Sequence, residues 1–225
     1  MSENSVKILN CSKTVNMVGS ISRKSKDALS FPGRILKRVF DFVASLIGII
    51  VFSPFFVIIY FYIKNEDGGP AIFKQERIGY KGKAFMLYKF RSMTMAAEAD
   101  GKPVLCRKED DRLTGVGKFL REHHLDELPQ LWNVLKGDMS FVGPRPERKY
   151  FVDQIMAVNP DYKLLYSLRP GLFSPATLYN GYTDTMEKML RRLNMDLAYM
   201  ENHTLWLDIK IIFLTVYYIL SGKKF

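Results

Sequence analysis

The chain has 225 residues, enough for one hydrophobic core with appendages, so we expect one main domain. Lysine and arginine number 33 against 23 acidic residues, and the formal charge of +10 favours an anionic partner such as phosphate, acidic lipid or nucleic acid. The two cysteines, Cys11 and Cys106, match no metal-site spacing, which disfavours a zinc module and a disulfide scaffold and fits a reducing compartment.

The N-terminal segment, residues 1–33, is predicted to be a polar tail. Its first 30 residues are rich in serine, lysine and asparagine, with no apolar run beside the start. That composition argues against a cleavable secretory signal in this segment.

An uncharged run follows, from Phe42 to Ile63, and it is long enough for a bilayer core that needs about 20 apolar residues. Basic residues precede the run, so the positive-inside tendency places its N-terminal flank in the cytoplasm. Pro54 removes a helical hydrogen bond at a cost of about 3 kcal/mol in an ordinary helix. Ser53 beside it can offer a hydroxyl to the freed carbonyl. Residues 34–64 therefore form either a kinked span or a re-entrant helix that is broken at Ser53-Pro54 and returns to the same face.

Residues 65–204 are predicted to form the main domain, in which helices dominate and strand is scarce. A turn cluster of two glycines and a proline opens it at Gly68. Its predicted elements are short strand-like pieces at Ala71–Phe73 and Phe85–Tyr88, a helical stretch at Val116–Leu135 interrupted near Pro129, and amphipathic helices at Glu147–Asn159 and Thr185–Met200.

Residues 205–225 form the last predicted element. The stretch Leu205–Leu220 is apolar and aromatic except for Asp208 and Lys210, and it is short for a membrane span. We expect an interfacial amphipathic helix followed by a short tail. The predicted fold class is therefore mainly α with little β, a compact helical domain on a membrane helix with interfacial amphipathic helices.

The densest polar cluster lies between Glu109 and Glu147, and it contains the adjacent acids Asp126 and Glu127. Neighbours on a regular helix diverge by about 100°, so a disturbance at Pro129 is needed for both carboxylates to approach one phosphate. A carboxylate is a workable covalent nucleophile toward phosphorus. Magnesium is normally held by one or two carboxylates plus substrate and water. Surface acids at a helix start, favoured by the dipole, are the alternative interpretation.

Three arginines accompany these acids and are candidate phosphate ligands, with solvated surface charges as the alternative. Arg145 stands between two prolines, and a rigid loop loses little entropy on binding. The other two are Arg112 and Arg121.

Two stretches carry a specific pattern. They are Gly69–Met93 (GPAIFKQERIGYKGKAFMLYKFRSM) and Asp110–Glu147 (DDRLTGVGKFLREHHLDELPQLWNVLKGDMSFVGPRPE). Both closely resemble the bacterial sugar transferase family, the monotopic polyprenyl-phosphate phosphoglycosyl transferases. Together with Ser53-Pro54, Arg169-Pro170-Gly171 and Trp206-Leu207-Asp208, the resemblance covers nearly everything from Arg34 to Ile212. The chain is similar to the small, single-domain members.

The resemblance implies a reaction. The family moves a sugar-1-phosphate from a nucleotide diphospho-sugar, here expected to be a UDP-sugar, to undecaprenyl phosphate and releases the nucleoside monophosphate. This is the first membrane step of bacterial glycan synthesis. Asp126 matches the family's nucleophile, which forms a phosphosugar ester on the enzyme. Glu127 matches the ligand of the magnesium cofactor, Mg²⁺.

The resemblance also implies supporting residues. Positions that would clamp phosphate oxygens are Arg112, Arg121 and Arg145, with Lys89 and Arg91 of the KFRSM motif as further candidates. Asp196 and Asp208 fall where the family has acidic residues near the active site, and either would serve to orient an arginine.

The family's Ser-Pro pair breaks a re-entrant helix, so the resemblance favours the bent form of residues 34–64. The expected location is the cytoplasmic face of the bacterial inner membrane, as a monotopic protein in contact with membrane lipids, with a homodimer left open. One departure concerns substrate choice more than the reaction. Many members follow Arg-Pro-Gly with a tract close to ITGWAQVNGR, whereas this chain reads LFSPATLYNGY from Leu172 to Tyr182.

Three alternatives stay open. Direct displacement would use Asp126 as a base or metal ligand, and a non-catalytic membrane scaffold would use the polar cluster to bind headgroups or a partner. A membrane-tethered nucleic-acid binder fits the charge, but the sequence has no recognised binding motif and the central acids would repel a phosphate backbone. No nucleic-acid partner is therefore expected. The histidines His123, His124 and His203 lack ligand spacing and are interpreted as surface or packing residues.

Overall fold

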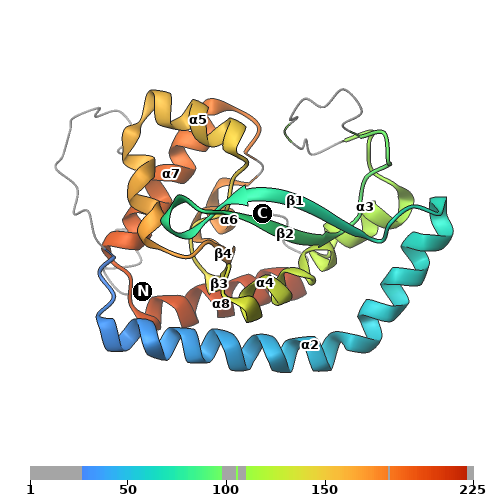
Figure 1. The fold of residues 1–225 in the computed structure, drawn as a ribbon, viewed down its shortest axis with the longest axis horizontal. Coiled ribbons are helices and arrows are strands. Elements are labelled where there is room, and N and C mark those ends of the chain that lie inside the picture. The colour runs from blue at the N-terminus through green and yellow to red at the C-terminus, as the bar shows by residue number, and fades with distance from the viewer. Residues whose placement is uncertain (1–26, 98–104, 106–109, 182, 222–225) are drawn as a thin grey trace.

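The computed structural model describes residues 27–97, 105, 110–181 and 183–221, and this part of the chain is mainly helical (Figure 1). The predicted fold class, mainly α with little β, is confirmed. The α-helices are α2 (Phe31–Asp67), α3 (Gly115–Glu122), α4 (Gln130–Lys136), α5 (Lys149–Val158), α6 (Pro175–Asn180), α7 (Met186–Glu201) and α8 (Leu205–Leu220). The strands and 3-10 helices are β1 (Ile72–Ile78), η1 (Tyr80–Gly82), β2 (Ala84–Phe90), η2 (Leu125–Glu127), β3 (Ser140–Val142), η3 (Pro160–Ser167) and β4 (Gly171–Phe173).

Most of the predicted polar tail and both cysteines lie outside the described residues. The end of that segment, residues 27–33, contacts the domain and includes the first residues of α2. Asp27 is buried, and Ser30 caps α2 by accepting a hydrogen bond from the Gly33 N–H.

Helix α2 lies along one edge of the molecule and bends once, so that its C-terminal part turns toward the domain (Figure 1). Pro54 is inside this helix, and it leaves the Ile50 carbonyl without a helical N–H donor. The Ser53 hydroxyl donates to that carbonyl at 2.8 Å. The sequence therefore explains both the bend and how the freed backbone group is satisfied.

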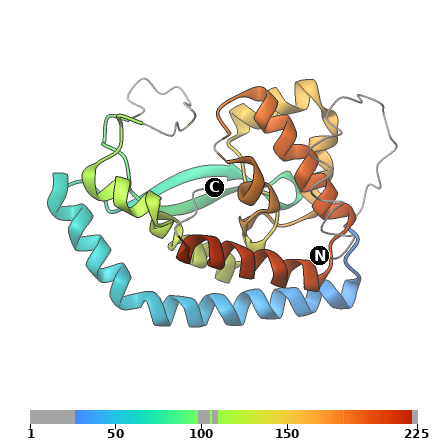
Figure 2. The same cartoon turned by 180° about the vertical axis from the view of Figure 1, so that it is seen from behind.

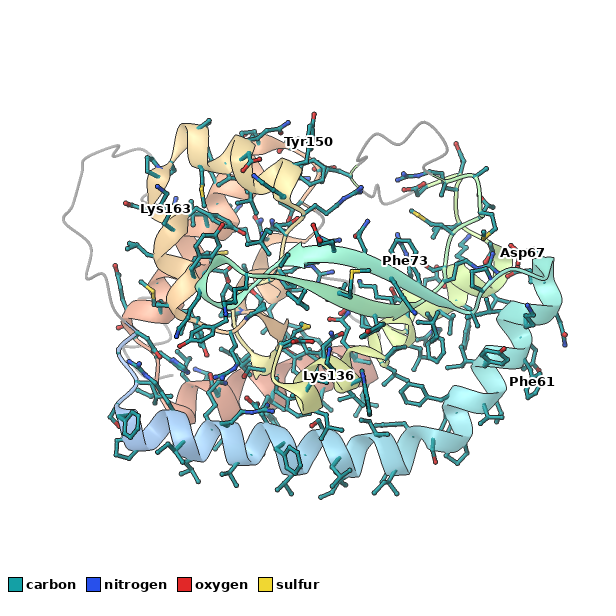
Figure 3. The ribbon with its side chains drawn as sticks, in the orientation of Figure 1. Phe61, Asp67, Phe73, Lys136, Tyr150 and Lys163 are labelled. Carbon is teal, nitrogen blue, oxygen red and sulfur yellow. The ribbon has the colours of Figure 1, made fainter. Side chains whose placement is uncertain are left out.

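Helix α2 is long and apolar enough to cross a membrane by length and composition. Its most apolar window has a mean hydropathy of 2.7, and only 11% of that window is buried, whereas the core helix of a soluble protein is mostly buried. Large apolar side chains are exposed from Phe31 to Phe61, and Figure 3 shows Phe61 on the outer side of the helix. These features indicate association with a membrane.

The inner face of the first half of α2 is polar and binds the domain. Lys37 Nζ lies 2.5 Å from Asp208 Oδ2 of α8, and Asp41 accepts the Phe141 N–H at 3.1 Å. Arg38 donates to two carbonyls at the C-terminal end of α4, an end that favours a positive charge. One side of this helix thus faces protein while the other is apolar and exposed.

Helix α8 has the predicted bounds, and it runs alongside α2 in both views (Figures 1 and 2). Trp206 and Leu220 are 75% and 82% exposed, so α8 adds to the apolar surface of α2. Asp208, one of the two charged residues of α8, faces the protein instead.

The two short sheets differ from the prediction. Strands β1 and β2 form an antiparallel hairpin with Ile72 opposite Phe90, longer than the predicted pieces at Ala71–Phe73 and Phe85–Tyr88. Strands β3 and β4 form a parallel pair that the sequence did not indicate. Residues on β3 and β4 are mostly buried, and such short apolar runs carry no alternating pattern.

Three buried clusters hold the domain together, and the smallest of them packs β2 against α4 through Leu87, Val134 and Met139. The largest one packs α5, η3 and α7 through residues such as Ile155, Leu193 and Leu197. The remaining one joins the C-terminal half of α2 to the hairpin and α3 through Ile63, Phe90 and Leu120. The membrane-facing helix is therefore part of the core.

The predicted helical stretch at Val116–Leu135 is broken earlier than expected. Helix α3 ends at His123, and His124 adopts the left-handed conformation with φ 55°. Pro129, which we predicted to disturb the helix, is instead the N-terminal cap of α4. Proline is tolerated at a helix start because its missing N–H is not needed there.

Candidate active site

Asp126 and Glu127 lie together in η2, the short turn between α3 and α4. The left-handed His124 ends the α3 direction, so the two acids follow a tight 3-10 turn rather than a regular helix. Asp126 is only 5% exposed, although a charged carboxylate is rarely that buried without a partner. Its burial makes the alternative of a solvated surface acid a poor description of this residue.

Two cations meet at the Glu127 carboxylate. Lys89 Nζ, from strand β2, lies 2.6 Å from Glu127 Oε1 and 3.9 Å from Asp126 Oδ2. Arg145 Nη2, from the loop after β3, lies 2.9 Å from the same Glu127 oxygen. The structure therefore brings four of the predicted site residues together from three separate segments of the chain.

Burial and these cations shift the pKa values of the two acids in opposite directions. Burial, together with the neighbouring Glu127 carboxylate, raises the pKa of Asp126, although Lys89 opposes this effect. Burial also disfavours the charged form of Glu127, but Lys89 and Arg145 outweigh it and hold the pKa of Glu127 well below its usual range. Glu127 is therefore the firmly ionised member of the pair, and the charge on Asp126 depends on what approaches it.

Helix α3 positions Arg121 beside this turn. Gly117 lets the helix approach the chain closely, since a Cβ there would lie 2.0 Å from the Ser92 backbone oxygen. Arg121 Nε then donates to Ser92 Oγ at 2.9 Å. Its positive charge lowers the pKa of Asp126, so Arg121 lies within electrostatic reach of the acid.

Asp196 of α7 supports the Arg145 loop from behind. Its carboxylate accepts from the Ser174 hydroxyl at 2.8 Å and from the backbone N–H of Arg145. Burial raises the pKa of Asp196 to about 7, although Arg192 and these two donors oppose the effect. Asp196 thus holds the backbone of an arginine, which is one of the roles that the sequence suggested for it.

The sequence did not indicate a second support for this loop. Glu147 is 6% exposed and forms ion pairs with Arg192 at 2.5 Å and with Arg77 at 3.3 Å. Its carbonyl also accepts the Ile78 N–H, which joins the loop to strand β1. These ion pairs link α7, the hairpin and the Arg145 loop. Their members are far apart in the sequence, so the sequence alone does not predict that they pair.

Three predicted site residues make their contacts elsewhere. Arg91 is buried just after β2, where both terminal guanidinium nitrogens donate to the carboxylate of Asp67 at the C-terminal end of α2, labelled in Figure 3. Arg112 bonds to Asp110 at 2.7 Å and 2.6 Å. The geometry makes Arg91 a tether for α2 and gives no support to its predicted role as a phosphate ligand.

Asp208 is the third of these residues. It contacts Lys37, Tyr199 and His203, far along the chain from the acid pair. His203, which we interpreted as a surface or packing residue, is 3% exposed and lies between Asp208 and Asp27. This cluster of buried charged side chains joins α8 to α2 through the Lys37–Asp208 ion pair.

His124 is a site residue that the sequence analysis set aside. Burial lowers its pKa, and the carboxylates of Glu127 and Asp126 act against that effect, which places the ring close to both acids. Its left-handed backbone also creates the turn. Only its position two residues before Asp126 could have drawn attention to it.

The site is compatible with a divalent cation bound together with a substrate. Within the described residues, no group of three or more His, Cys, Asp or Glu side chains could hold a metal by themselves. Magnesium, however, usually takes only one or two carboxylates and completes its shell with phosphate oxygens and water. Lys89 and Arg145 both contact Oε1 of Glu127, and this carboxylate is firmly ionised, as a magnesium ligand must be.

Comparisons with known proteins agree on one family. A family model described as bacterial sugar transferase matches residues 32–222. The chain is 44% identical over 185 residues to a UDP-glucose:undecaprenyl-phosphate glucose-1-phosphate transferase of Klebsiella pneumoniae, covering 81% of this chain and 40% of that protein. It is 41% identical to a UDP-N-acetylgalactosamine-undecaprenyl-phosphate N-acetylgalactosaminephosphotransferase of Aeromonas hydrophila, covering 83% and 44%.

A third relative, an undecaprenyl-phosphate galactose phosphotransferase of Salmonella typhimurium, is 40% identical and covers 81% of this chain and 40% of the relative. The chain thus spans about two fifths of the length of these three proteins. All three are named for transfer to or from undecaprenyl phosphate, but for different sugars.

Proposed function

The chain belongs to the bacterial sugar transferase family, and from that premise we propose that it moves a sugar-1-phosphate from a UDP-sugar to undecaprenyl phosphate and releases UMP. The observation that carries the proposal is the buried Asp126 beside an ionised Glu127, with Lys89 and Arg145 on the same oxygen of Glu127. Phosphoryl transfer needs positioning and positive charge around the phosphate oxygens more than it needs further covalent chemistry. This cluster supplies a nucleophile and cations in one place.

In the first step, an Asp126 carboxylate oxygen attacks the phosphorus that bears the sugar. The bond from that phosphorus to the bridging oxygen of UMP breaks, and UMP leaves with the electron pair. Lys89, 3.9 Å from Asp126, and Arg121 favour the ionised, attacking form of the carboxylate. The product of this step is a phosphosugar ester on Asp126.

In the second step, a phosphate oxygen of undecaprenyl phosphate attacks the same phosphorus. The bond to Asp126 breaks, which restores the carboxylate and yields the lipid diphosphosugar. Arg145 is suited to bind the transferred phosphate because Asp196 fixes its backbone and two prolines restrict its loop. Glu127 would hold Mg²⁺ together with diphosphate oxygens, and the ion would offset the negative charge on the phosphates.

The same proposal places the protein on the cytoplasmic face of the bacterial inner membrane, with α2 as a monotopic, re-entrant helix. Both ends of α2 contact the one domain, and this supports the topology. Near its start, Lys37 pairs with Asp208. At its end, Glu66 accepts the Val116 N–H at 3.1 Å and Asp67 pairs with Arg91. A helix that crossed the bilayer would carry its two ends to opposite sides.

The covalent step can be tested by brief incubation with a radiolabelled UDP-sugar without lipid acceptor. Label that stays on the protein through denaturation, with a matching amount of UMP released, is the expected result. Asp126→Asn should retain no label. The matched control is Asp153→Asn, which changes an exposed acid on α5 that pairs with Lys149 one helical turn away.

Direct displacement makes a different prediction in the same assay. It requires that UMP is released only when undecaprenyl phosphate is present. The label then goes directly to the lipid and is never found on the protein. If the unsubstituted protein turns over with acceptor but never carries label without it, the covalent route is wrong and direct transfer replaces it. A scaffold without catalysis predicts instead that the unsubstituted protein releases no UMP even with undecaprenyl phosphate present, and that Asp126→Ala and Glu127→Ala leave its biological activity intact.

A further inference from the structure

Strand β2, which carries Lys89, has another strand on one edge only. It pairs with β1, and within the described residues this sheet consists of these two strands. Backbone groups on the other edge of β2 need partners of a different kind, because a buried N–H or carbonyl without a hydrogen bond destabilises the fold. Helix α4 lies against the hairpin, between it and α2 (Figure 1).

Asn133 of α4 supplies these partners with its side chain. Its carboxamide oxygen accepts the Tyr88 N–H at 3.1 Å, and its carboxamide nitrogen donates to the Met86 carbonyl at 2.7 Å. The two bonds flank Leu87 and reproduce those that one residue of a neighbouring parallel strand would make. Asn133 is 0% exposed, so water does not compete for either bond.

Helix α4 is continuous with the turn that carries the acid pair. Only Leu128 and Pro129 separate η2 from α4. Their carbonyls accept the N–H groups of Leu131 and Trp132 at 3.0 Å and 3.1 Å. Because the turn and the helix share one run of backbone hydrogen bonds, a side chain that fixes α4 also fixes the acids.

The Asn133 bonds therefore connect the acids to the strand that carries their cation. Lys89 directly follows Tyr88, and its Nζ lies 2.6 Å from Glu127 Oε1 and 3.9 Å from Asp126 Oδ2. The smallest buried cluster also holds β2 against α4, but hydrophobic contact is non-directional and does not fix a position along the strand. Hydrogen bonds to two defined backbone groups do fix it.

We propose that Asn133 is a positioning residue that sets the distance of Lys89 from the Asp126–Glu127 pair, an inference that rests on the proposed function. Without the two side-chain bonds, β2 can shift along α4 and carry Lys89 away from the acids. A misplacement of about 1 Å, even one caused far from the chemistry, can cost a factor of about 10² in rate. Asn133 thus acts on the reaction through Lys89.

Kinetics of substituted proteins test this role. Asn133→Ala removes both bonds, and we expect kcat to fall by about 10² while the KM for the UDP-sugar stays within about threefold, because the lost contact is to the acids. Asn133→Asp keeps the volume but replaces the donor to the Met86 carbonyl by an oxygen, and it decides the test if Asn133→Ala does not fold. The matched control is Asn202→Ala, which removes an exposed asparagine that donates to the Ala198 carbonyl at 2.8 Å and should leave kcat unchanged.

A double-mutant cycle with Lys89→Met separates positioning from general support of the fold. If Asn133 acts through Lys89, its substitution should lower kcat by less than about threefold once Lys89 is already replaced. An equal loss in both backgrounds would overturn the proposal. An unchanged kcat in the deciding single variant would overturn it as well.

Trace acetylation reports the placement of Lys89 without any turnover. The Lys89 side chain is 19% exposed and paired with Glu127, whereas Lys149 is 69% exposed and serves as the internal reference. In Asn133→Ala, peptide mass spectrometry should find severalfold more acetylation of Lys89 relative to Lys149. Lys37, which is 14% exposed and paired with Asp208, should not change. No rise at Lys89, or an equal rise at Lys37 that indicates general loosening, would overturn the proposal.

Failure of the proposed function has a different signature. In that case the unsubstituted protein releases no UMP from any UDP-sugar when undecaprenyl phosphate is added. The acetylation of Lys89 would still report whether Asn133 holds this side chain beside the acids.

Discussion

Replacing Asp196 with asparagine should make the protein more stable at alkaline pH. Burial raises the pKa of Asp196 from its ordinary value of 3.8 to about 7. A group whose pKa is higher in the folded state contributes stability that is fully present below the unfolded value and is lost as the pH rises through the folded value. For Asp196 this window runs from pH 3.8 to about 7.

The magnitude follows from the two pKa values. Their difference, at about 1.4 kcal/mol for each pH unit, corresponds to about 4 kcal/mol as an upper bound on the cost of the buried charge. For a chain of this size that is a difference in Tm of roughly 10 °C. Asparagine keeps an oxygen that can accept from the Ser174 hydroxyl and the Arg145 N–H, so Asp196→Asn should retain most of the transferase activity.

The assay is thermal unfolding of both proteins in one detergent from pH 5 to pH 9. The Tm of Asp196→Asn should rise relative to that of the unsubstituted protein as the pH increases from 5 to about 7, and the difference should stay constant at higher pH. The exposed control Asp153→Asn should follow the unsubstituted protein throughout. A difference between Asp196→Asn and the unsubstituted protein that does not vary with pH would refute the reasoning.

Four further predictions address the site and the membrane helix. Asp126→Asn should abolish transfer. At pH 8 this variant should melt no lower than the unsubstituted protein, because burial raises the pKa of Asp126 and its charged form therefore destabilises the folded state. Arg145→Lys should lower kcat/KM by about 10², because a lysine cannot keep the guanidinium geometry, and an unchanged value in the coupled UMP assay would contradict this. Gly117→Ala should destabilise the fold by about 3 kcal/mol or more, because its Cβ would meet the Ser92 backbone oxygen, and a normal denaturation midpoint would count against that close approach. Pro54→Ala should straighten α2 and lower activity, and labelling of single cysteines in sealed vesicles should find both flanks of α2 on one side only while the proline is present.

The sequence predicts the bounds of single helices better than it predicts the contacts between them. Helix α8 has the predicted bounds, and the Ser53 hydroxyl satisfies the carbonyl freed by Pro54, because both features depend on local chemistry. The break between α3 and α4 was placed at Pro129, yet it occurs at His124. A left-handed histidine has no strong local signal, because most residues outside glycine adopt this conformation rarely and no pattern of neighbours marks it.

The same distinction applies to the candidate site. A resemblance in motifs pointed to Lys89, Arg145 and the acid pair, and these side chains do meet. It gave Arg91 the same role, but the pairing of Arg91 with Asp67 depends on the path of α2 through space. Contacts between segments so far apart in the chain leave no periodic pattern that one sequence can reveal.

The fastening of α2 at both ends has a consequence for how the protein responds to its lipid environment. A spanning helix must match the full thickness of the hydrocarbon layer, and it tilts or deforms the bilayer when the match is poor. In a re-entrant form, α2 would be fixed to its own domain near both ends. The Lys37–Asp208 ion pair lies near its start, and the Asp67–Arg91 ion pair lies at its end. The depth of α2 in the bilayer would then be set by its contacts with the domain, and the helix would contact only the near leaflet. The height of Asp126 and Glu127, the proposed catalytic acids, relative to the headgroups would therefore be the same in thin and thick membranes.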